Sequence, residues 1–295
     1  MRTSDEIFQR YEALRPRLPV AQQDNPASGS IASLHDVTPE IDAFVFDAFG
    51  VLNVGERPIK GAVARLSQLR QLGLKLRVVT NAASYNAKAT QQKFRRLGFS
   101  FLPEEIITSR SAAFAALDDR HWGVIADNND PLTDIPFKNS RLGNDPADYA
   151  AVEGFLFLST ANWSDHQQTM LEDTLAKDPR RVVIANADLA APRDFSFSIE
   201  PGFWGHQIAD RLGLDVEFFG KPFRGIFEIA QSTLQGISPD RIAMCGDSLH
   251  TDVLGANAMG WKSVFVTQDG LFKDLDQQRI IDQSNITPDW ITPRI

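Results

Sequence analysis

Cysteine is almost absent from this chain of 295 residues, which has only Cys245 and therefore cannot form an internal disulfide. Basic tracts are absent as well, since 30 Lys and Arg stand against 38 Asp and Glu, a net charge of −8 that argues against a nucleic-acid surface. No apolar run approaches the roughly 18 residues of a membrane span, and the first six residues are too polar for a signal peptide. These absences predict a soluble, cytoplasmic protein with neither a nucleic-acid nor a membrane partner.

The composition that remains is that of an ordinary globular protein. The chain is 43% hydrophobic and 23% charged, with 19 Gly and 16 Pro. Its length is near the upper limit for a single hydrophobic core, so we expect two domains.

Residues 41–55 contain the most informative stretch. The continuous apolar run of residues 43–46 predicts a strand buried on both faces of a parallel sheet, and Asp47 follows it directly. Gly50 and Gly55 allow a sharp turn just beyond, at the strand end where open α/β sheets bind ligands. Asp47 is therefore a catalytic candidate, and the alternative is an aspartate that only caps the next turn.

Strand and helix patterns then alternate along the chain. A short amphipathic helix over residues 3–14 and a polar loop over Gln22–Ser30 precede the first strand. Further helices are predicted over 61–72, 86–97, 109–117, 165–177, 223–234 and from about 252 to 259. Strands are predicted over 76–79, 106–108, 122–126, 154–158, 182–185, 216–219, 241–245 and 263–266, and a polar loop over 128–148.

This rhythm predicts an α/β fold whose core is a doubly wound, Rossmann-like parallel sheet. Between about 118 and 214 the pattern restarts, which indicates a smaller inserted α/β domain. We therefore expect an N-terminal helix and loop extension over 1–40, a core formed by 41–117 and 215–295, and an inserted domain over 118–214.

Polar residues follow several of the predicted core strands, and a doubly wound sheet would gather them at one edge. They are Asp47, Thr80, Lys221, Asp247 and Asp252. Phosphoryl transfer to a carboxylate requires such a set: a nucleophilic acid, carboxylates that hold a hard cation, and a lysine and a hydroxyl for the phosphate oxygens. No single residue of the set is specific, but their order and spacing are.

The same residues resemble the motifs of the haloacid dehalogenase (HAD) superfamily from about residue 42 to the end. The first motif is similar to Asp47-Ala-Phe-Gly-Val-Leu, the second to Thr80-Asn81, the third to Gly220-Lys221-Pro222 and the fourth to Gly246-Asp247 with Thr251-Asp252. The insertion between the second and third motifs, with Asn186-Ala-Asp188 inside it, resembles the cap of class IIA phosphatases of the NagD, nitrophenyl-phosphatase and pyridoxal-phosphatase type.

The resemblance implies a Mg²⁺-dependent phosphatase that acts on a small phosphorylated metabolite through an aspartyl-phosphate on Asp47. It implies that Thr80, Asn81 and Lys221 hold the phosphate, with Asp188 reaching over from the cap. Asp247 would bind Mg²⁺ together with Asp47 and the Phe49 carbonyl, and Asp252 would orient Lys221 or water on the metal. Members of this class often pair through their caps, so the resemblance also implies a homodimer.

Phe49 departs from the phosphatase pattern, which has a second aspartate at this position. That aspartate protonates the leaving oxygen and later activates water, and losing such catalysis typically costs ~10²–10⁴ in rate. Two alternatives follow: a HAD-fold protein that binds a phosphorylated ligand with little or no turnover, and a hydrolase like the 2-haloacid dehalogenases, whose first motif has an aromatic residue here. The position of the insertion argues against a dehalogenase.

Other residues have weaker signals. We expect His250 to lie near solvent at a helix start and to be passive, although it could serve as a base, and Cys245 to be inert in the core. Trp204 and His206 either read the substrate or pack inside the cap. The Gly-Phe-Trp-Gly sequence at 202–205 is compatible with a close-packed loop.

Overall fold

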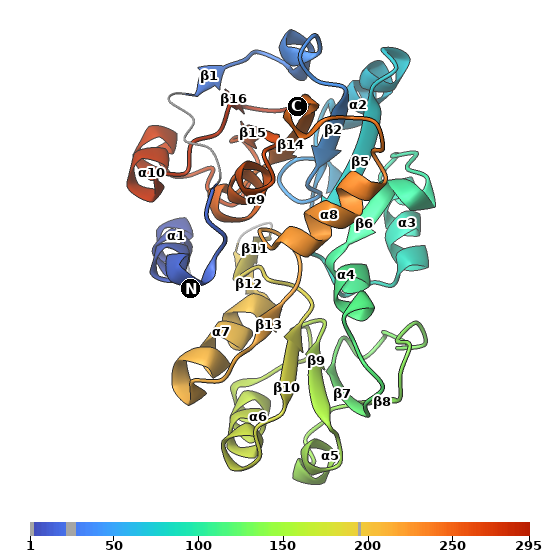
Figure 1. The fold of residues 1–295 in the computed structure, drawn as a ribbon, viewed down its shortest axis with the longest axis vertical. Helices are drawn as coiled ribbons and strands as arrows, with labels where there is room; N and C mark the ends of the chain where they lie inside the picture. Colours follow the sequence, from blue (N-terminus) through green and yellow to red (C-terminus); the bar gives the residue numbers. More distant parts are fainter. Residues whose placement is uncertain (1–2, 22–27, 194–195) are drawn as a thin grey trace.

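A seven-stranded parallel sheet forms the larger part of the protein (Figure 1). The computed structural model describes residues 3–21, 28–193 and 196–295. In spatial order the strands are β1 (Gly29–Ser30), β16 (Trp290–Thr292), β15 (Lys262–Val266), β14 (Ile242–Gly246), β2 (Ala43–Phe46), β5 (Lys75–Thr80) and β6 (Ile106–Thr108).

Strand β2 is buried on both faces, as its continuous apolar run predicts. Phe44 and Phe46 pack in one hydrophobic cluster with residues of α2 (Ala62–Gln71) and α3 (Ala87–Arg96). Ala43 and Val45 pack in another cluster with residues of α4 (Ser109–Ala115), α8 (Arg224–Ser232) and α9 (Leu254–Ala258). Helices thus cover both faces of the sheet, which is the predicted doubly wound arrangement.

The chain reverses its winding direction at β2. From β2 it proceeds outward through β5 to β6, and after the second sheet it returns to β14, on the other side of β2, and proceeds through β15 to β16. A ligand crevice is expected outside the carboxyl ends of strands at such a switch point. Asp47 and Asp247 follow the two strands that meet there.

A second parallel sheet of five strands occupies the middle of the chain. Its order is β13 (Glu217–Phe218), β10 (Arg181–Ile184), β9 (Gly154–Phe157), β7 (Trp122–Ile125) and β8 (Asn139–Arg141), accompanied by α5 (Pro146–Ala150), α6 (Asp165–Lys177) and α7 (Pro201–Leu212). Figure 1 shows this sheet below the larger one, with the hairpin β11 (Ala190–Pro192) and β12 (Phe197–Ile199) between them. A smaller hairpin, β3 (Asn53–Val54) and β4 (Arg57–Pro58), follows Asp47.

Two segments of this second sheet differ from the sequence-based expectation. The loop predicted over 128–148 contains β8 and the start of α5, because an edge strand made of Asn139, Ser140 and Arg141 has no apolar alternation. The predicted domain boundary after residue 214 assigned strand β13 to the core, but β13 pairs with β10 of the second sheet. The division into domains remains a prediction, with its second boundary better placed after Phe218.

The prediction of a loop at residues 202–205 is wrong, because these residues lie within helix α7. Pro201 occupies the first turn, where its missing N–H costs nothing. A Cβ at Gly202 would lie 2.2 Å from the Ala187 carbonyl oxygen, and one at Gly205 would lie 2.5 Å from Ile184 Cγ1. The two glycines therefore let the helix lie directly against the sheet.

The N-terminal helix α1 (Ser4–Ala13) contacts loops that follow strands of both sheets, and it contacts α7. Its apolar residues pack with Leu189 and Leu249 in one cluster, and Arg10 forms an ion pair with Asp210 of α7. Arg279 of α10 (Gln277–Ser284) pairs with Asp5. Part of the polar loop predicted at Gln22–Ser30 lies outside the described residues, and its end forms β1.

None of the helices in the described part of the chain is long and apolar enough to cross a bilayer.

Candidate active site

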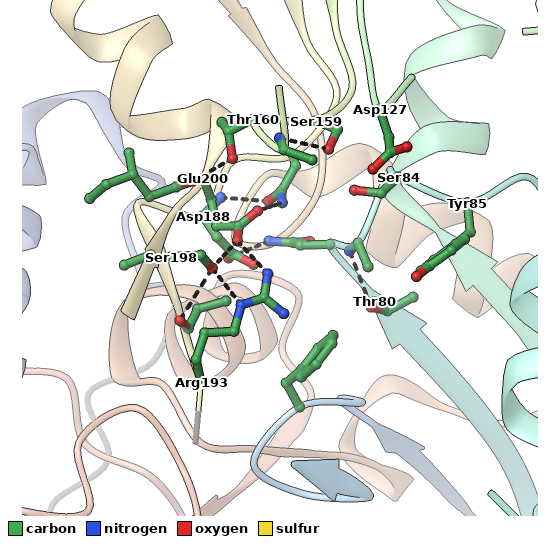
Figure 2. Close-up of a pocket in the computed structure, with 18 of the residues that line it drawn as sticks. Thr80, Ser84, Tyr85, Asp127, Ser159, Thr160, Asp188, Arg193, Ser198 and Glu200 are labelled. Carbon is green, nitrogen blue, oxygen red and sulfur yellow. Dashed lines mark hydrogen bonds and ion pairs between the residues drawn. The ribbon is translucent and has the colours of Figure 1, made fainter. Parts of the chain in front are cut away.

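Asp47 lies at the floor of a pocket of about 930 Å³ at the switch point of the large sheet. Its backbone N–H donates to the Cys245 carbonyl at 2.9 Å, which ties the end of β2 to the end of β14. The pocket is also lined by residues of the second sheet's loops and of the hairpin β11–β12 (Figure 2). The strand-end acid predicted from the sequence is therefore exposed to a cavity between the two sheets.

Lys221 connects two of the predicted carboxylates. Its Nζ lies 2.5 Å from Asp47 Oδ1 and 2.7 Å from Asp252 Oδ1. The side chains of Lys221 and Asp252 are 2% and 1% exposed, whereas that of Asp47 is 13% exposed. Asp252 thus holds the ammonium from beneath, and Asp47 is the partner that faces the pocket.

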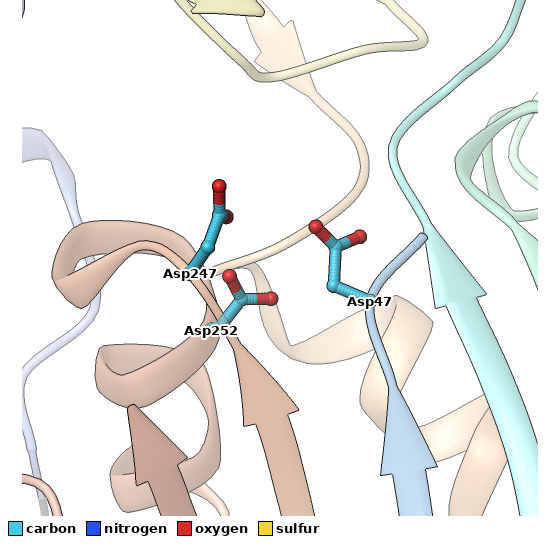
Figure 3. Close-up of side chains that lie close together, drawn as sticks. All are labelled: Asp47, Asp247 and Asp252. Atoms are coloured by element: carbon cyan, nitrogen blue, oxygen red, sulfur yellow. The ribbon is translucent and has the colours of Figure 1, made fainter. Parts of the chain in front are cut away.

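Three carboxylates converge at this point (Figure 3). One oxygen each from Asp47, Asp247 and Asp252 lies within 4.8 Å of the others. Burial raises the pKa of Asp47 to about 7, although Lys221 opposes the rise. Burial and the charges of Asp47 and Asp252 also raise the pKa of Asp247 well above its usual range. The crowded, buried oxygen donors fit a hard divalent cation, which would offset their repulsion.

The loops after β2 and β15 enclose Asp247 closely. Its Oδ2 accepts from the Leu271 N–H at 2.7 Å. A Cβ at Gly50 would lie 2.2 Å from the same Oδ2, and a Cβ at Gly270 would lie 2.3 Å from Asp247 Cβ. Glycine at both positions therefore lets two loops approach the carboxylate.

Asp252 belongs to a π-helical turn, Leu249–Val253, which leads into α9. Its Oδ2 accepts from the Ser248 N–H at 3.2 Å, while its Oδ1 holds Lys221. A Cβ at Gly246 would lie 2.0 Å from Asp252 Cγ, so the strand end admits this side chain only beside glycine. The contacts are those that a positioning role for Asp252 requires.

Asn81 organises the loop after β5. Its Oδ1 accepts from the Lys221 N–H at 2.7 Å, and its Nδ2 donates to the Lys221 carbonyl at 2.9 Å and to Asp188 Oδ1 at 2.8 Å. Thr80, which also lines the pocket, accepts from the Ala82 N–H through Oγ1 at 3.2 Å. The structure thus brings all the predicted site residues together, and their individual roles remain predictions.

Asp188 reaches this site from the second sheet, as its position in the insertion suggested. Burial raises its pKa to about 7, with Lys221 and Asn81 opposing the rise. Beside it, Tyr11 of α1 accepts from the Leu189 N–H at 3.2 Å through its hydroxyl. Tyr11 lines the pocket, a role that the helical spacing of the N-terminal segment does not reveal.

Sequence reasoning also missed other lining residues, among them the charged Glu56, Lys93 and Arg193. The Phe49 ring also lines the pocket, and Lys93 Nζ lies 4.5 Å from its centroid. The sequence contains one indication for Lys93, which is its position directly before Phe94, a residue that faces inward on the predicted helix. This indication is recognisable only once the structure is known.

The predictions for the residues with weaker sequence signals are only partly confirmed. His250 is fully buried, with Nε2 2.6 Å from Glu12 Oε1, so the prediction that it lies near solvent is wrong. The N-terminal helix covers it. Cys245 is buried in the core, as expected. Trp204 lines the pocket, whereas His206 is buried and stacks on Phe218 with 4.1 Å between ring centroids.

Known protein families match the segments of the chain that contain these motifs. A family model described as haloacid dehalogenase-like hydrolase matches residues 44–132, and a second HAD-hydrolase-like model matches 218–295. The D-glycerol 3-phosphate phosphatase of Mycobacterium tuberculosis is 29% identical over 241 residues, which cover 79% of this chain and 65% of that protein. A structure of a glycerol phosphate phosphatase from that organism in complex with calcium has a TM-score of 0.68 at 21% identity, covering 86% of this chain and 74% of the other.

Two other solved structures share the fold over most of this chain. A possible sugar phosphatase from Cytophaga hutchinsonii has a TM-score of 0.81 at 26% identity, covering 90% of this chain and 98% of the other. NagD from Escherichia coli has a TM-score of 0.67 at 20% identity, covering 86% and 96%. The sequence motifs, the topology and these matches agree that the chain belongs to the haloacid dehalogenase-like hydrolases, with the capped fold of the NagD type.

Proposed function

We propose that this protein is a Mg²⁺-dependent phosphatase of small phosphorylated metabolites, with Asp47 as the nucleophile. The observation that supports it most is the ion pair of Asp47 with Lys221, whose other partner, Asp252, is buried. A carboxylate held by a fixed ammonium at the floor of a pocket is placed to attack phosphorus. Relatives named as glycerol phosphate and sugar phosphatases support this substrate class.

The reaction would proceed in two displacements on this carboxylate. An Asp47 oxygen attacks the phosphorus, the ester oxygen leaves, and water then hydrolyses the aspartyl-phosphate and restores the carboxylate. Lys221 and Thr80 would bind the phosphoryl oxygens, where charge spreads in the transition state. Asn81 would fix the Lys221 backbone and, through Asp188, the cap above it.

Asp47, Asp247 and the Phe49 carbonyl would hold the cation. When bound, Mg²⁺ supplies charge neutralisation for the phosphate and the crowded carboxylates. No Cys or His belongs to the cluster of metal-capable side chains among the described residues, which favours an oxygen-binding cation over zinc. The proposal includes a cytoplasmic location and, from the class, a homodimer formed through the caps.

Phe49 supports a second candidate, a protein that binds a phosphorylated ligand with little turnover. Its phenyl ring can neither protonate a leaving oxygen nor activate water. A phosphatase with this residue should favour esters whose leaving groups need no proton, such as nitrophenyl or acyl phosphates.

The test is a screen of phosphate esters with the native protein, Asp47→Asn and Asp42→Asn. Asp42 precedes β2 as Asp47 follows it, but it pairs with Arg241 away from the pocket, so its variant serves as the matched control. We expect Asp47→Asn to abolish turnover and Asp42→Asn to retain it. Wild-type turnover in Asp47→Asn would end the nucleophile assignment. Inactive native protein that nevertheless binds these esters, with no burst of protein-bound phosphate, would favour the binder.

A further inference from the structure

The pocket contains a second group of cations besides Lys221. Lys93, on α3, has a side chain that is only 10% exposed. Its Nζ lies 4.5 Å from the centroid of the Phe49 ring and 5.7 Å from that of Tyr85, both of which line the pocket. The ammonium is therefore held against aromatic faces next to the nucleophile loop, where cation–π attraction compensates part of its lost hydration.

Arg193 approaches from the cap side, directly after β11. Its Nε donates to Ser198 Oγ at 3.1 Å, and its Nη2 lies 3.5 Å from Glu200 Oε1. In Figure 2 the Arg193 guanidinium lies beside Ser198 on the cap side of the pocket, which it lines, and its side chain is 49% exposed. Since a guanidinium has five N–H donors, these two contacts leave it able to donate to a ligand as well.

The two cations act on each other. Burial lowers the pKa of Lys93, Glu56 opposes this, and the Arg193 charge lowers the pKa further. Two positive groups within electrostatic range in one pocket attract an anion between them. The carboxylate nearest to Lys93 is that of Glu56, at 3.4 Å, and its side chain is 64% exposed. An ion pair with so exposed a partner is weak, so a ligand can replace Glu56.

We propose that Lys93 and Arg193 form a second anion subsite, which takes a carboxylate of the substrate while the ester phosphate lies at Asp47. A ligand carboxylate would replace that of Glu56 one for one, and its planar oxygens match the guanidinium fork. This inference rests on the proposed function and narrows its substrate class to small phosphate monoesters that carry a carboxylate. The nucleophile, the cation ligands and Lys221 are outside this subsite.

Ligand binding tests the subsite without requiring turnover. We would measure by calorimetry, with Mg²⁺ and Asp47→Asn protein, the affinities of 3-phosphoglycerate and glycerol 3-phosphate, which differ by a carboxylate in place of a hydroxymethyl group. One charge-assisted contact predicts about tenfold tighter binding of 3-phosphoglycerate. Adding Lys93→Met or Arg193→Gln should reduce this preference to about one while retaining glycerol 3-phosphate. Lys88→Met, an exposed lysine on the same helix, should leave it unchanged.

A gain-of-binding variant covers the case in which Lys93→Met does not fold. Glu56→Gln removes the competing carboxylate at an exposed position and should increase the preference for 3-phosphoglycerate, with glycerol 3-phosphate unaffected. Equal affinities for the two ligands, or a preference that Lys93→Met, Arg193→Gln and Glu56→Gln all leave unchanged, would overturn the subsite. If the preference is present but native protein hydrolyses no ester, the subsite stands and the proposed phosphatase function fails.

Discussion

The buried His206 should make the protein lose stability in weak acid. It is 2% exposed on α7, stacked on Phe218, and its Nδ1 has no hydrogen-bond partner among the described residues. Burial lowers its pKa to about 3, the charges of Arg17 and Arg10 lower it as well, and Asp210 opposes them. The imidazole therefore remains neutral in the folded protein where an unfolded histidine is protonated.

The size of the effect follows from proton linkage. Because the folded pKa is depressed, the contribution of His206 is fully present above the unfolded value of about 6.5 and is lost as the pH falls from there toward 3. Between pH 7 and pH 5 the loss from this one group is about 2 kcal/mol of unfolding free energy.

Urea unfolding at pH 7 and pH 5, followed by tryptophan fluorescence, measures this loss. His206→Phe keeps a ring that can stack on Phe218 but cannot be protonated, so the variant should lose about 2 kcal/mol less than the native protein over this interval. His166→Gln, at an exposed histidine of α6, should retain the native difference. If His206→Phe and native protein lose the same free energy, His206 does not resist protonation and the argument from its burial is wrong.

Two further predictions concern the metal and the ion pair between Arg110 of α4 and Asp130, which follows β7 of the second sheet. Arg110→Met should reduce the free energy of unfolding by about 3–5 kcal/mol, measured by urea unfolding. The side chains of Arg110 and its partner Asp130 are each 2% exposed, so the Asp130 carboxylate would remain buried without its cation. A loss below about 1 kcal/mol would contradict this reasoning. Excess chelator should abolish phosphatase activity and added Mg²⁺ should restore it, except in Asp247→Ala; undiminished activity in chelator, or native activity in Asp247→Ala, would exclude the proposed cation site.

Much of the fold could be predicted because its core elements have strong local patterns. The apolar strands β2, β5 and β14 and the helices with periodic leucines are recognisable from sequence alone. The edge strands β1 and β8 are not, because short polar strands acquire their conformation from pairing with a neighbour. Helix α7 was missed since its glycines lower helix propensity, and only the packed structure shows what they accommodate.

The residues of the site also fall into those that could be predicted from the sequence and those that could not. Residues that directly follow strands, such as Asp47 and Lys221, could be predicted to meet because parallel strands end at one edge of a sheet. Lys93 and Tyr11 reach the pocket from helices, so their proximity depends on how α3 and α1 pack. His250 was misplaced because the sequence does not show that an N-terminal helix, with Glu12, covers it.

Phe49 affects the proposed anion subsite as well as the acid–base chemistry. Lys93 Nζ lies 4.5 Å from the Phe49 ring centroid, so a carboxylate in the place of the ring would be close enough to pair with the ammonium. The phenyl ring thus leaves Lys93 available for a substrate carboxylate, at the cost of leaving-group protonation.

Phe49→Asp should therefore shift both properties in opposite directions. Turnover of alkyl phosphates such as glycerol 3-phosphate should rise, within the ~10²–10⁴ that general acid–base catalysis provides, provided that the new carboxylate reaches the leaving oxygen. The binding preference for 3-phosphoglycerate should fall, because the new carboxylate competes for Lys93. Phe49→Leu, which removes the ring without adding a carboxylate, should give no gain in turnover. If Phe49→Asp folds and binds Mg²⁺ but gains nothing, while native protein already hydrolyses alkyl phosphates at ordinary rates, another residue is the acid–base and this account of Phe49 is wrong.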